Sequence, residues 1–141
     1  MTKEGMLQAA DPYAHIWARI ATDNPAWTLL GIRLKELRPG EATLVLPFRP
    51  EILNPWGSVH GGIVTGLADA AGGCALYTRT TPQQRVSSIE LKVNFLKPLT
   101  GDARAEARVL HHGTRTGVSF VEVHGPSGLA AVALLTFALV G

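Results

Sequence analysis

One long helical pattern lies in the middle of this chain, with strand patterns on both sides, and this arrangement limits the folds that the sequence can adopt. From about Gly61 the apolar residues recur on one helix face, as Ile63, Leu67, Ala70, Cys74 and Tyr77. After Pro82 the period changes to two, which is the pattern of strands. Because one apolar helix and one antiparallel sheet must cover each other, the sequence predicts the α+β class.

Six strands are predicted, two before the helix and four after it. Residues 30–48 contain two strands around a Pro39-Gly40 turn. In 86–96 apolar and polar residues alternate, and this parity places Ser88 on the polar face. Short links join the four later strands and suit antiparallel neighbours. These links are Pro98–Gly101, His112–Gly113 and Gly125–Gly128.

The length of 141 residues indicates a single domain over 1–141, with a helical N-terminal extension at 1–24. Asp11-Pro12 is a helix-start signal, and Asn24-Pro25 is expected to end that helix. The last strand pattern, 129–140, is apolar on both faces. Its outer face therefore needs a cover, which would be either the N-terminal helix or another subunit.

Composition and charge exclude several classes of protein. The net charge is only +2 and no Lys/Arg cluster is present, so no nucleic-acid partner is expected. The longest apolar run has 12 residues, which is too short for a membrane span. The N-terminus lacks a signal-peptide pattern, and the single Cys74 fits a reducing compartment. We therefore expect a soluble cytoplasmic protein without a membrane partner.

Asp69 is the only formally charged side chain between Glu51 and Arg79. Its neighbours on the same helix stripe are mostly glycines, and each interior glycine costs a helix about 0.5–1 kcal/mol relative to alanine. Close approach of a backbone or a ligand would compensate this cost. A carboxylate partly withdrawn from water is a stronger base, which suits a general base or a nucleophile. The alternative is a structural aspartate that pairs with an arginine or caps a backbone group.

Gly61 and Gly62 stand at the expected helix N-terminus, where backbone N–H groups lack partners and the helix dipole is positive. Such amides can form an oxyanion hole, and the alternative is a tight loop-to-helix turn. Gly61 and Asp69 would lie about 12 Å apart along one helix, too far to serve one reacting centre. Two antiparallel copies packed through the glycine face would solve this, so we expect at least a dimer with sites shared between chains.

The segment NPWGSVHGGIVTGLAD resembles the active-site segment of hotdog-fold acyl-CoA thioesterases, especially the phenylacetate-pathway (PaaI) type. The family spacing is kept by Asn54, Gly57, His60-Gly61-Gly62 and Asp69, and SSIELKVNFLKP resembles the strand after the helix. The resemblance implies a curved antiparallel sheet wrapped around the helix, in a homodimer that is often doubled to a tetramer. It also implies hydrolysis of an acyl-CoA to a free acid and CoA without a cofactor.

The resemblance assigns a role to each matching residue. Asp69 matches the catalytic carboxylate, which activates water or attacks the thioester carbonyl, and Gly61 matches the backbone donor to the thioester oxygen. Asn54 matches a polar residue near the water or the leaving sulfur, and His60 matches a residue that holds the loop and supports the oxyanion site. Ser88 matches a serine that helps to place the water, although its parity requires a bulge or a partner chain. Substrate-binding positions are expected at Gly57, Gly62, Thr65 and Gly73.

An aryl- or medium-chain acyl-CoA is the expected substrate. In the related 4-hydroxybenzoyl-CoA thioesterases the carboxylate is Glu with Thr four residues on, whereas Asp69 is followed here by Gly73. This difference argues against that subgroup and leaves room beside the helix. The CoA phosphates need basic neighbours, for which the candidates are Arg79, Arg85, Lys92, Lys97 and Arg115. No metal is expected, because the adjacent His111 and His112 on a strand point opposite ways.

One other interpretation of the sequence stays open at this point, a hotdog module that binds or senses acyl-CoA without catalysis. A third interpretation, a hotdog hydratase, is disfavoured because it needs an Asp/His pattern that the sequence lacks. The identity of the acyl group, the choice between water activation and an anhydride intermediate, and the tetramer geometry are also open.

Overall fold

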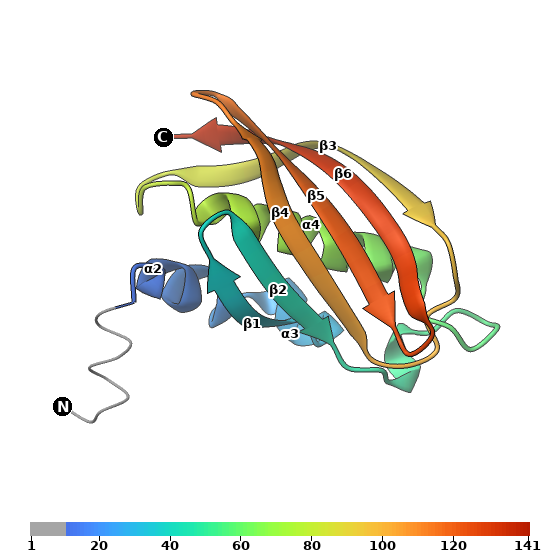
Figure 1. Ribbon diagram of the computed structural model, residues 1–141. Coiled ribbons are helices and arrows are strands. Elements are labelled where there is room, and N and C mark those ends of the chain that lie inside the picture. The colour runs from blue at the N-terminus through green and yellow to red at the C-terminus, as the bar shows by residue number, and fades with distance from the viewer. Residues whose placement is uncertain (1–10) are drawn as a thin grey trace.

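The computed structural model describes residues 11–141, so the first ten residues of the expected N-terminal extension lie outside the described part. A six-stranded antiparallel sheet curves around the long helix α4 (Gly61–Tyr77), as Figure 1 shows. This arrangement confirms the predicted α+β class. The strands are β1 (Arg33–Arg38), β2 (Glu41–Leu46), β3 (Arg85–Phe95), β4 (Ala103–His112), β5 (Thr116–Gly125) and β6 (Gly128–Val140).

The strand order is β1-β2-β4-β5-β6-β3, which corrects the expectation that β3 and β4 are neighbours. β3 pairs with β6 at the edge of the sheet, and the link 96–102 passes the ends of β6 and β5 before β4 begins. Three strand spacings amount to about 14 Å, which seven extended residues span easily. The Val59 N–H anchors this link by donating to the Leu99 carbonyl at 2.9 Å. A short link between two strands in the sequence therefore does not mean that the two strands are neighbours in the sheet.

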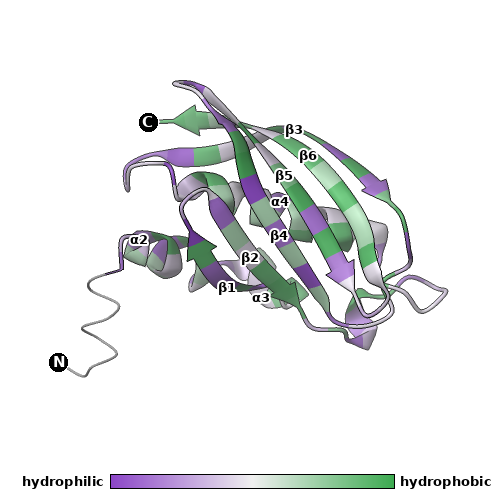
Figure 2. Cartoon of the chain, viewed as in Figure 1, coloured by the Kyte–Doolittle hydropathy of each residue, from purple (hydrophilic) through white to green (hydrophobic). Residues whose placement is uncertain are grey.

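The alternating pattern in β4 places its small apolar residues against α4. Ala103, Ala105 and Ala107 are buried, whereas the charged residues between them are exposed. Figure 2 shows this alternation of hydrophilic and hydrophobic residues along β4. The period-two pattern of the sequence thus correctly predicted which face of this strand is covered by the helix.

The N-terminal segment consists of α2 (Ala14–Ile16) and the π-helical turn η1 (Trp17–Ala21). The helix does not start at Asp11 as expected, because Tyr13 is its N-cap and Pro12 lies in the turn before it. Asp11 instead supports this turn, where its Oδ1 accepts the Tyr13 N–H at 2.8 Å. The segment packs beside β1 and the C-terminal end of α4, and Ile16 is fully buried there. It does not cover the outer face of β6, where Leu134 remains 47% exposed. Of the two covers expected for the outer face of β6, the N-terminal helix is therefore excluded for residues 11–24.

A second short helix, α3 (Pro25–Leu30), follows where only a helix end was expected. Asn24 caps it by accepting the Trp27 N–H at 3.3 Å, and Pro25 occupies the first helical position. Gly31 ends it with a φ of 84°. The Asn-Pro pair thus marks the start of a second helix soon after the first one ends. A 3-10 turn, η2 (Pro50–Ile52), precedes the loop that leads to α4.

Two glycines of α4, Gly72 and Gly73, face the sheet, and Gly72 allows it to approach the helix closely. A Cβ on Gly72 would lie 3.3 Å from side-chain atoms of both Leu135 and Phe137, which are almost fully buried. The Gly72 carbonyl accepts a hydrogen bond from the buried Ser119 hydroxyl at 2.9 Å. Gly73 is also buried, and a Cβ on it would lie 3.7 Å from the nearest Phe137 atom. Helix–sheet packing thus accounts for Gly72, whereas the space at Gly73 would accept a Cβ in ordinary contact. Both glycines face the sheet, so the expected packing of two copies through the glycine face does not involve them.

Candidate active site

Asn54 organises the loop that precedes α4. Its Oδ1 accepts the N–H groups of Trp56 at 2.9 Å and Ser58 at 3.2 Å, and its Nδ2 donates to the Ser58 hydroxyl at 2.8 Å. Gly57 lies within this turn with a φ of 89°, a conformation that favours glycine. The loop is therefore held by the side chain of Asn54, while the Trp56 side chain at its tip is 87% exposed.

His60 caps the N-terminus of α4. Its Nδ1 accepts the Gly62 N–H at 3.0 Å, so a neutral imidazole carries its proton on Nε2. The backbone N–H of His60 donates to the Ile52 carbonyl at 2.9 Å, which ties the loop to η2. Among residues 11–141, no hydrogen bond engages the Gly61 N–H. Of the glycine pair, Gly61 thus keeps a free donor at the positive end of the helix dipole.

Replacing His60 with alanine is expected to destabilise the fold by about 1 kcal/mol, because α4 loses its side-chain cap. Asparagine at this position can accept the same N–H, so His60→Asn should recover most of the loss. Urea unfolding of the wild type, His60→Ala and His60→Asn, all at the same protein concentration, measures both effects. Equal midpoints for the wild type and His60→Ala would show that the cap contributes no stability.

Asp69 and Ser88 meet across the gap between α4 and β3. The Ser88 hydroxyl donates to Asp69 Oδ1 at 2.5 Å. Strand pairing explains how Ser88 reaches the helix, since Ser88 pairs with Phe137 and Glu90 with Thr136, which leaves one extra residue between them. This bulge turns Ser88 toward α4. The simple alternation that placed Ser88 on the polar face is therefore wrong, and the bulge that its role required is present.

The environment of Asp69 bears on the choice between a catalytic and a structural aspartate. The residue is half-buried, and no arginine or lysine forms a salt bridge with it among the described residues. Its hydrogen-bond partner is a neutral hydroxyl, which leaves the negative charge without a counter-ion in the described residues. A structural pairing with arginine is thus absent from the part of the chain that the structure describes.

The loop residues and Asp69 do not line one cavity within a single chain. A cavity of about 310 Å³ beside the N-terminus of α4 is bordered by Asn54, Ser58, Gly61 and Lys97. Its other lining residues are apolar: Val59, Val64, Phe95, Leu96, Pro98, Leu99 and Ala130. Neither Asp69 nor Ser88 reaches it. Phe95 and Leu96 were not among the predicted site residues. They could have been found as two consecutive apolar residues that end the alternation of the strand shortly before Pro98.

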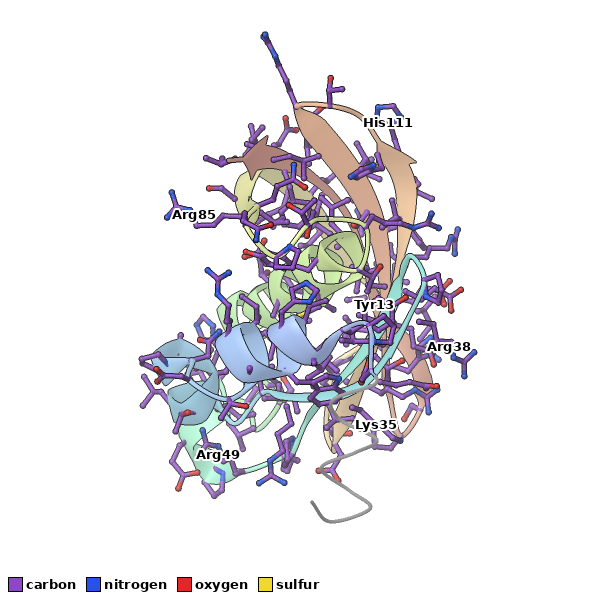
Figure 3. All side chains as sticks on the ribbon, turned by 90° about the vertical axis from the view of Figure 1, so that its left-hand side faces the viewer. Tyr13, Lys35, Arg38, Arg49, Arg85 and His111 are labelled. Carbon is purple, nitrogen blue, oxygen red and sulfur yellow. The ribbon has the colours of Figure 1, made fainter. Side chains whose placement is uncertain are left out.

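The remaining predicted positions fall into different surroundings. Thr65 is half-buried, and its hydroxyl donates to the Gly61 carbonyl at 2.8 Å. Arg79 follows the last turn of α4, Arg85 begins β3, and Arg115 lies in the turn between β4 and β5. All three arginines therefore lie near the C-terminal end of α4, which is about 25 Å from Gly61 along the helix. Figure 3 shows the Arg85 side chain directed away from the body of the molecule.

Other candidate sites are weaker. Burial raises the pKa of the Cys74 thiol to about 12, so this residue stays protonated and does not serve as a nucleophile. No group of three metal-ligating side chains occurs within residues 11–141. A hollow of about 330 Å³ on the outer face of the sheet is lined by mostly charged residues of β1, β2, β4 and β5, and no residue of the motif borders it. In the same described part, no helix is both long and apolar enough to cross a bilayer.

A curved antiparallel sheet wrapped around one central helix is the hotdog fold. The helix here carries a half-buried carboxylate, together with an N-terminal amide that has no partner among residues 11–141. These groups suit the hydrolysis of an acyl derivative, in which negative charge develops on a carbonyl oxygen. Residues 57–131 match the thioesterase superfamily. The chain belongs to this family, and it is a thioester hydrolase.

Known proteins of this family resemble the chain over most of its length. A 1,4-dihydroxy-2-naphthoyl-CoA hydrolase of Escherichia coli is 28% identical over 100 residues, covering 70% of this chain and 74% of that protein. A solved thioesterase family protein of Silicibacter pomeroyi has a TM-score of 0.83 at 27% identity, covering 94% and 98% of the two chains. A mutant of the phenylacetic acid degradation protein PaaI from Thermus thermophilus has a TM-score of 0.74 at 28% identity, covering 82% and 98%.

Proposed function

We propose that this chain is an acyl-CoA thioesterase that hydrolyses an aryl- or medium-chain acyl-CoA to a free acid and CoA. The observation that carries the proposal is the placement of Asp69, which is half-buried on α4 and accepts the Ser88 hydroxyl at 2.5 Å. Only Oδ1 is engaged among the described residues, so Oδ2 is available. That oxygen would take a proton from the attacking water, or would itself attack the thioester carbon.

The oxyanion donor of this reaction is the Gly61 N–H. It has no partner among residues 11–141, and it lies at the positive end of the dipole of α4. A donor held there stabilises the negative oxygen that develops as the carbonyl carbon becomes tetrahedral. The C–S bond then breaks, and CoA leaves as the thiolate. If water attacked, the free acid forms directly; if Asp69 attacked, water must then hydrolyse the acyl–Asp69 anhydride to release the acid and regenerate the carboxylate. Asn54 supports this step by holding the loop in front of Gly61, while His60 caps the helix.

A second copy of the chain completes the site in this proposal. Asp69 and Gly61 are about 12 Å apart along α4, so one chain does not bring both to one carbonyl. β3 is an edge strand, and it exposes 59% of Ile89 and 57% of Phe95. An apolar open edge is a template for strand pairing. Antiparallel pairing of two β3 strands would set the α4 helices side by side in opposite directions, with one chain's Gly61 near the other's Asp69.

The same pairing would bring distant basic residues to the substrate. Arg79, Arg85 and Arg115 lie at the opposite end of α4 from Gly61 within one chain. In an antiparallel dimer they would approach the other chain's loop, where they could neutralise CoA phosphates. Lys97 already borders the cavity beside Gly61. The exposed Leu134 on the outer face of β6 suits a further contact between dimers, which would give a tetramer.

The choice of an aryl- or medium-chain acyl group rests on the lining of the cavity and on the relatives. Apart from Asn54, Ser58, Gly61 and Lys97, the residues around this cavity of about 310 Å³ are apolar. Such a lining favours an apolar acyl group of moderate size over a polar one. The similarity to a naphthoyl-CoA hydrolase and to a PaaI protein supports the aryl class and the PaaI-type assignment.

Thiol release from a panel of phenylacetyl-CoA, benzoyl-CoA and hexanoyl-CoA tests the proposal. We expect at least one substrate to be hydrolysed with a kcat/KM of about 10⁴ M⁻¹ s⁻¹ or more. The buried Cys74 will not react with the thiol reagent, so the signal reports CoA alone. Tight binding of the panel without turnover would instead indicate a module that senses or carries acyl-CoA.

A further inference from the structure

Two side-chain hydrogen bonds connect α4 to the beginning of β3. One is the bond from the Ser88 hydroxyl to Asp69, at 2.5 Å. The other joins Tyr77, the last residue of α4, to the strand, because the Tyr77 hydroxyl accepts the backbone N–H of Val86 at 3.0 Å. The second bond holds the strand two residues before the serine that contacts the candidate catalytic carboxylate.

The beginning of β3 needs such support. β3 lies at the edge of the sheet, so among residues 11–141 only β6 pairs with it. The bulge after Ser88 interrupts that pairing, and a bulge leaves a residue out of the ladder. Val86 and Ser88 lie on the same side of the bulge and point to the same face, because their partners Leu139 and Phe137 are two residues apart. Fixing Val86 therefore fixes the direction in which the Ser88 side chain leaves the strand.

Tyr77 is itself held from its other side. It borders a small cavity of about 20 Å³ together with residues of the N-terminal segment, namely His15, Arg19 and Ile20. The Arg19 Nη1 donates to the Pro82 carbonyl at 2.6 Å, so the N-terminal segment also grips the connection that leads into β3. The tyrosine is half-buried and packs against the core. Its hydroxyl thus has a well-defined position from which to hold the strand.

A competing explanation is that the connection alone positions β3. Residues 78–84 contain their own hydrogen bonds, in which the Thr81 N–H donates to Gln84 Oε1 at 3.0 Å and the Gln84 N–H donates to the Thr81 carbonyl at 3.1 Å. If this turn were sufficient, the Tyr77 hydroxyl would only satisfy a backbone amide. The two explanations predict different behaviour when the hydroxyl is removed.

We propose that Tyr77 is a positioning residue that acts through Ser88: its hydroxyl holds the entry of β3 so that the Ser88 hydroxyl meets Asp69. This inference rests on the proposed function, since it assigns Tyr77 to the same thioesterase site. Tyr77 touches neither the substrate nor the reacting atoms in this scheme. Its contribution is the geometry of the hydroxyl–carboxylate pair, which matters in the transition state more than in substrate binding.

Tyr77→Phe removes the hydroxyl and keeps the ring. We expect kcat to fall about three- to tenfold, the factor supported by the loss of one ordinary hydrogen bond, with little change in KM. Tyr13→Phe is the matched control, because Tyr13 is the only other tyrosine and is also partly buried against the core. Its hydroxyl has no hydrogen-bond partner among the described residues, so this variant should keep the wild-type kcat.

A double-mutant cycle with Ser88→Ala shows whether Tyr77 acts through the serine. We expect Tyr77→Phe to lower kcat in the wild type but to change it less than about twofold in the Ser88→Ala background. A general structural effect would lower kcat by the same factor in both backgrounds. That result, or an unchanged kcat in the wild-type background, would overturn the proposal in favour of the 78–84 connection.

Amide hydrogen exchange separates this inference from the proposed function. Exchange of the segment 85–90 should be faster in Tyr77→Phe than in the wild type or in Tyr13→Phe, with the centre of α4 unaffected. If the wild type hydrolyses none of the acyl-CoA panel, the proposed function fails, and the exchange data still test the contact. Faster exchange confined to 85–90 would support the positioning of the strand by Tyr77, and unchanged exchange would refute it.

Discussion

Replacing Asp69 with asparagine is expected to lower kcat by about 10²–10⁴-fold while acyl-CoA still binds. Asparagine keeps the shape of the side chain, and its Oδ1 can still accept the Ser88 hydroxyl that lies 2.5 Å away. It can neither take a proton from water nor attack a carbonyl. The loss should therefore fall on the chemical step, whether Asp69 acts as a base or as a nucleophile.

Thiol release measures the catalytic loss, and calorimetry with an unreactive thioether analogue of the substrate measures binding. Asp102→Asn is a matched control, because Asp102 Oδ1 also accepts a hydrogen bond, from the Phe48 N–H at 2.7 Å, but borders no part of the candidate site. That variant should keep full turnover. Equal thiol release by the wild type and Asp69→Asn would remove Asp69 from the mechanism.

Co-expression of two impaired chains is expected to restore activity if the site is shared between subunits. The first chain carries Asp69→Asn and an intact loop, and the second carries Asn54→Ala and an intact carboxylate. Asn54→Ala should be impaired because the loop loses the three hydrogen bonds that its side chain makes. In a mixed twofold dimer, one of the two sites then combines the intact loop of the first chain with the intact Asp69 of the second. Random mixing should recover about one quarter of the wild-type turnover, since half of the dimers are mixed.

The control for this experiment pairs Asp69→Asn with Ser88→Ala. Asp69 and Ser88 contact each other within one chain, so a mixed dimer of these two variants contains no intact site. Its activity should not exceed the mean of the two parents. Failure of the Asn54→Ala mixture to rise above its parents, with mixed dimers detected by native mass spectrometry, would mean that each site is built within one chain.

The fold class follows from patterns that are local in the sequence. The small apolar residues Ala103, Ala105 and Ala107 alternate with charged ones, and β4 buries them against α4 as predicted. The helical stripe from Gly61 to Tyr77 forms one helix with those bounds. Such periodicities depend only on the geometry of neighbouring residues, so they can be recognised without knowing the partners. The assignment of residues 1–141 to one domain stays a prediction.

Part of the candidate site could also be predicted from a pattern that is local in the sequence. The spacing of Asn54, His60, Gly61 and Asp69 is enough to place the loop, the helix N-terminus and the carboxylate in order along the chain. It also places Gly61 and Asp69 too far apart for one chain, because the rise of a helix per residue is constant. The catalytic roles of these residues stay predictions that the experiments above test.

Long-range strand pairing decided what the sequence alone did not. The bulge after Ser88 reverses the alternation of β3 and turns the serine to Asp69, and it depends on how β3 pairs with β6, some 50 residues away in the chain. The position of β3 at the open edge has the same origin, as does the contact of Tyr77 with Val86. The sequence by itself determined the helix α4, the six strands and the spacing of the motif residues. Only the tertiary structure decided which side chains meet, because strand order and register arise from contacts between distant segments.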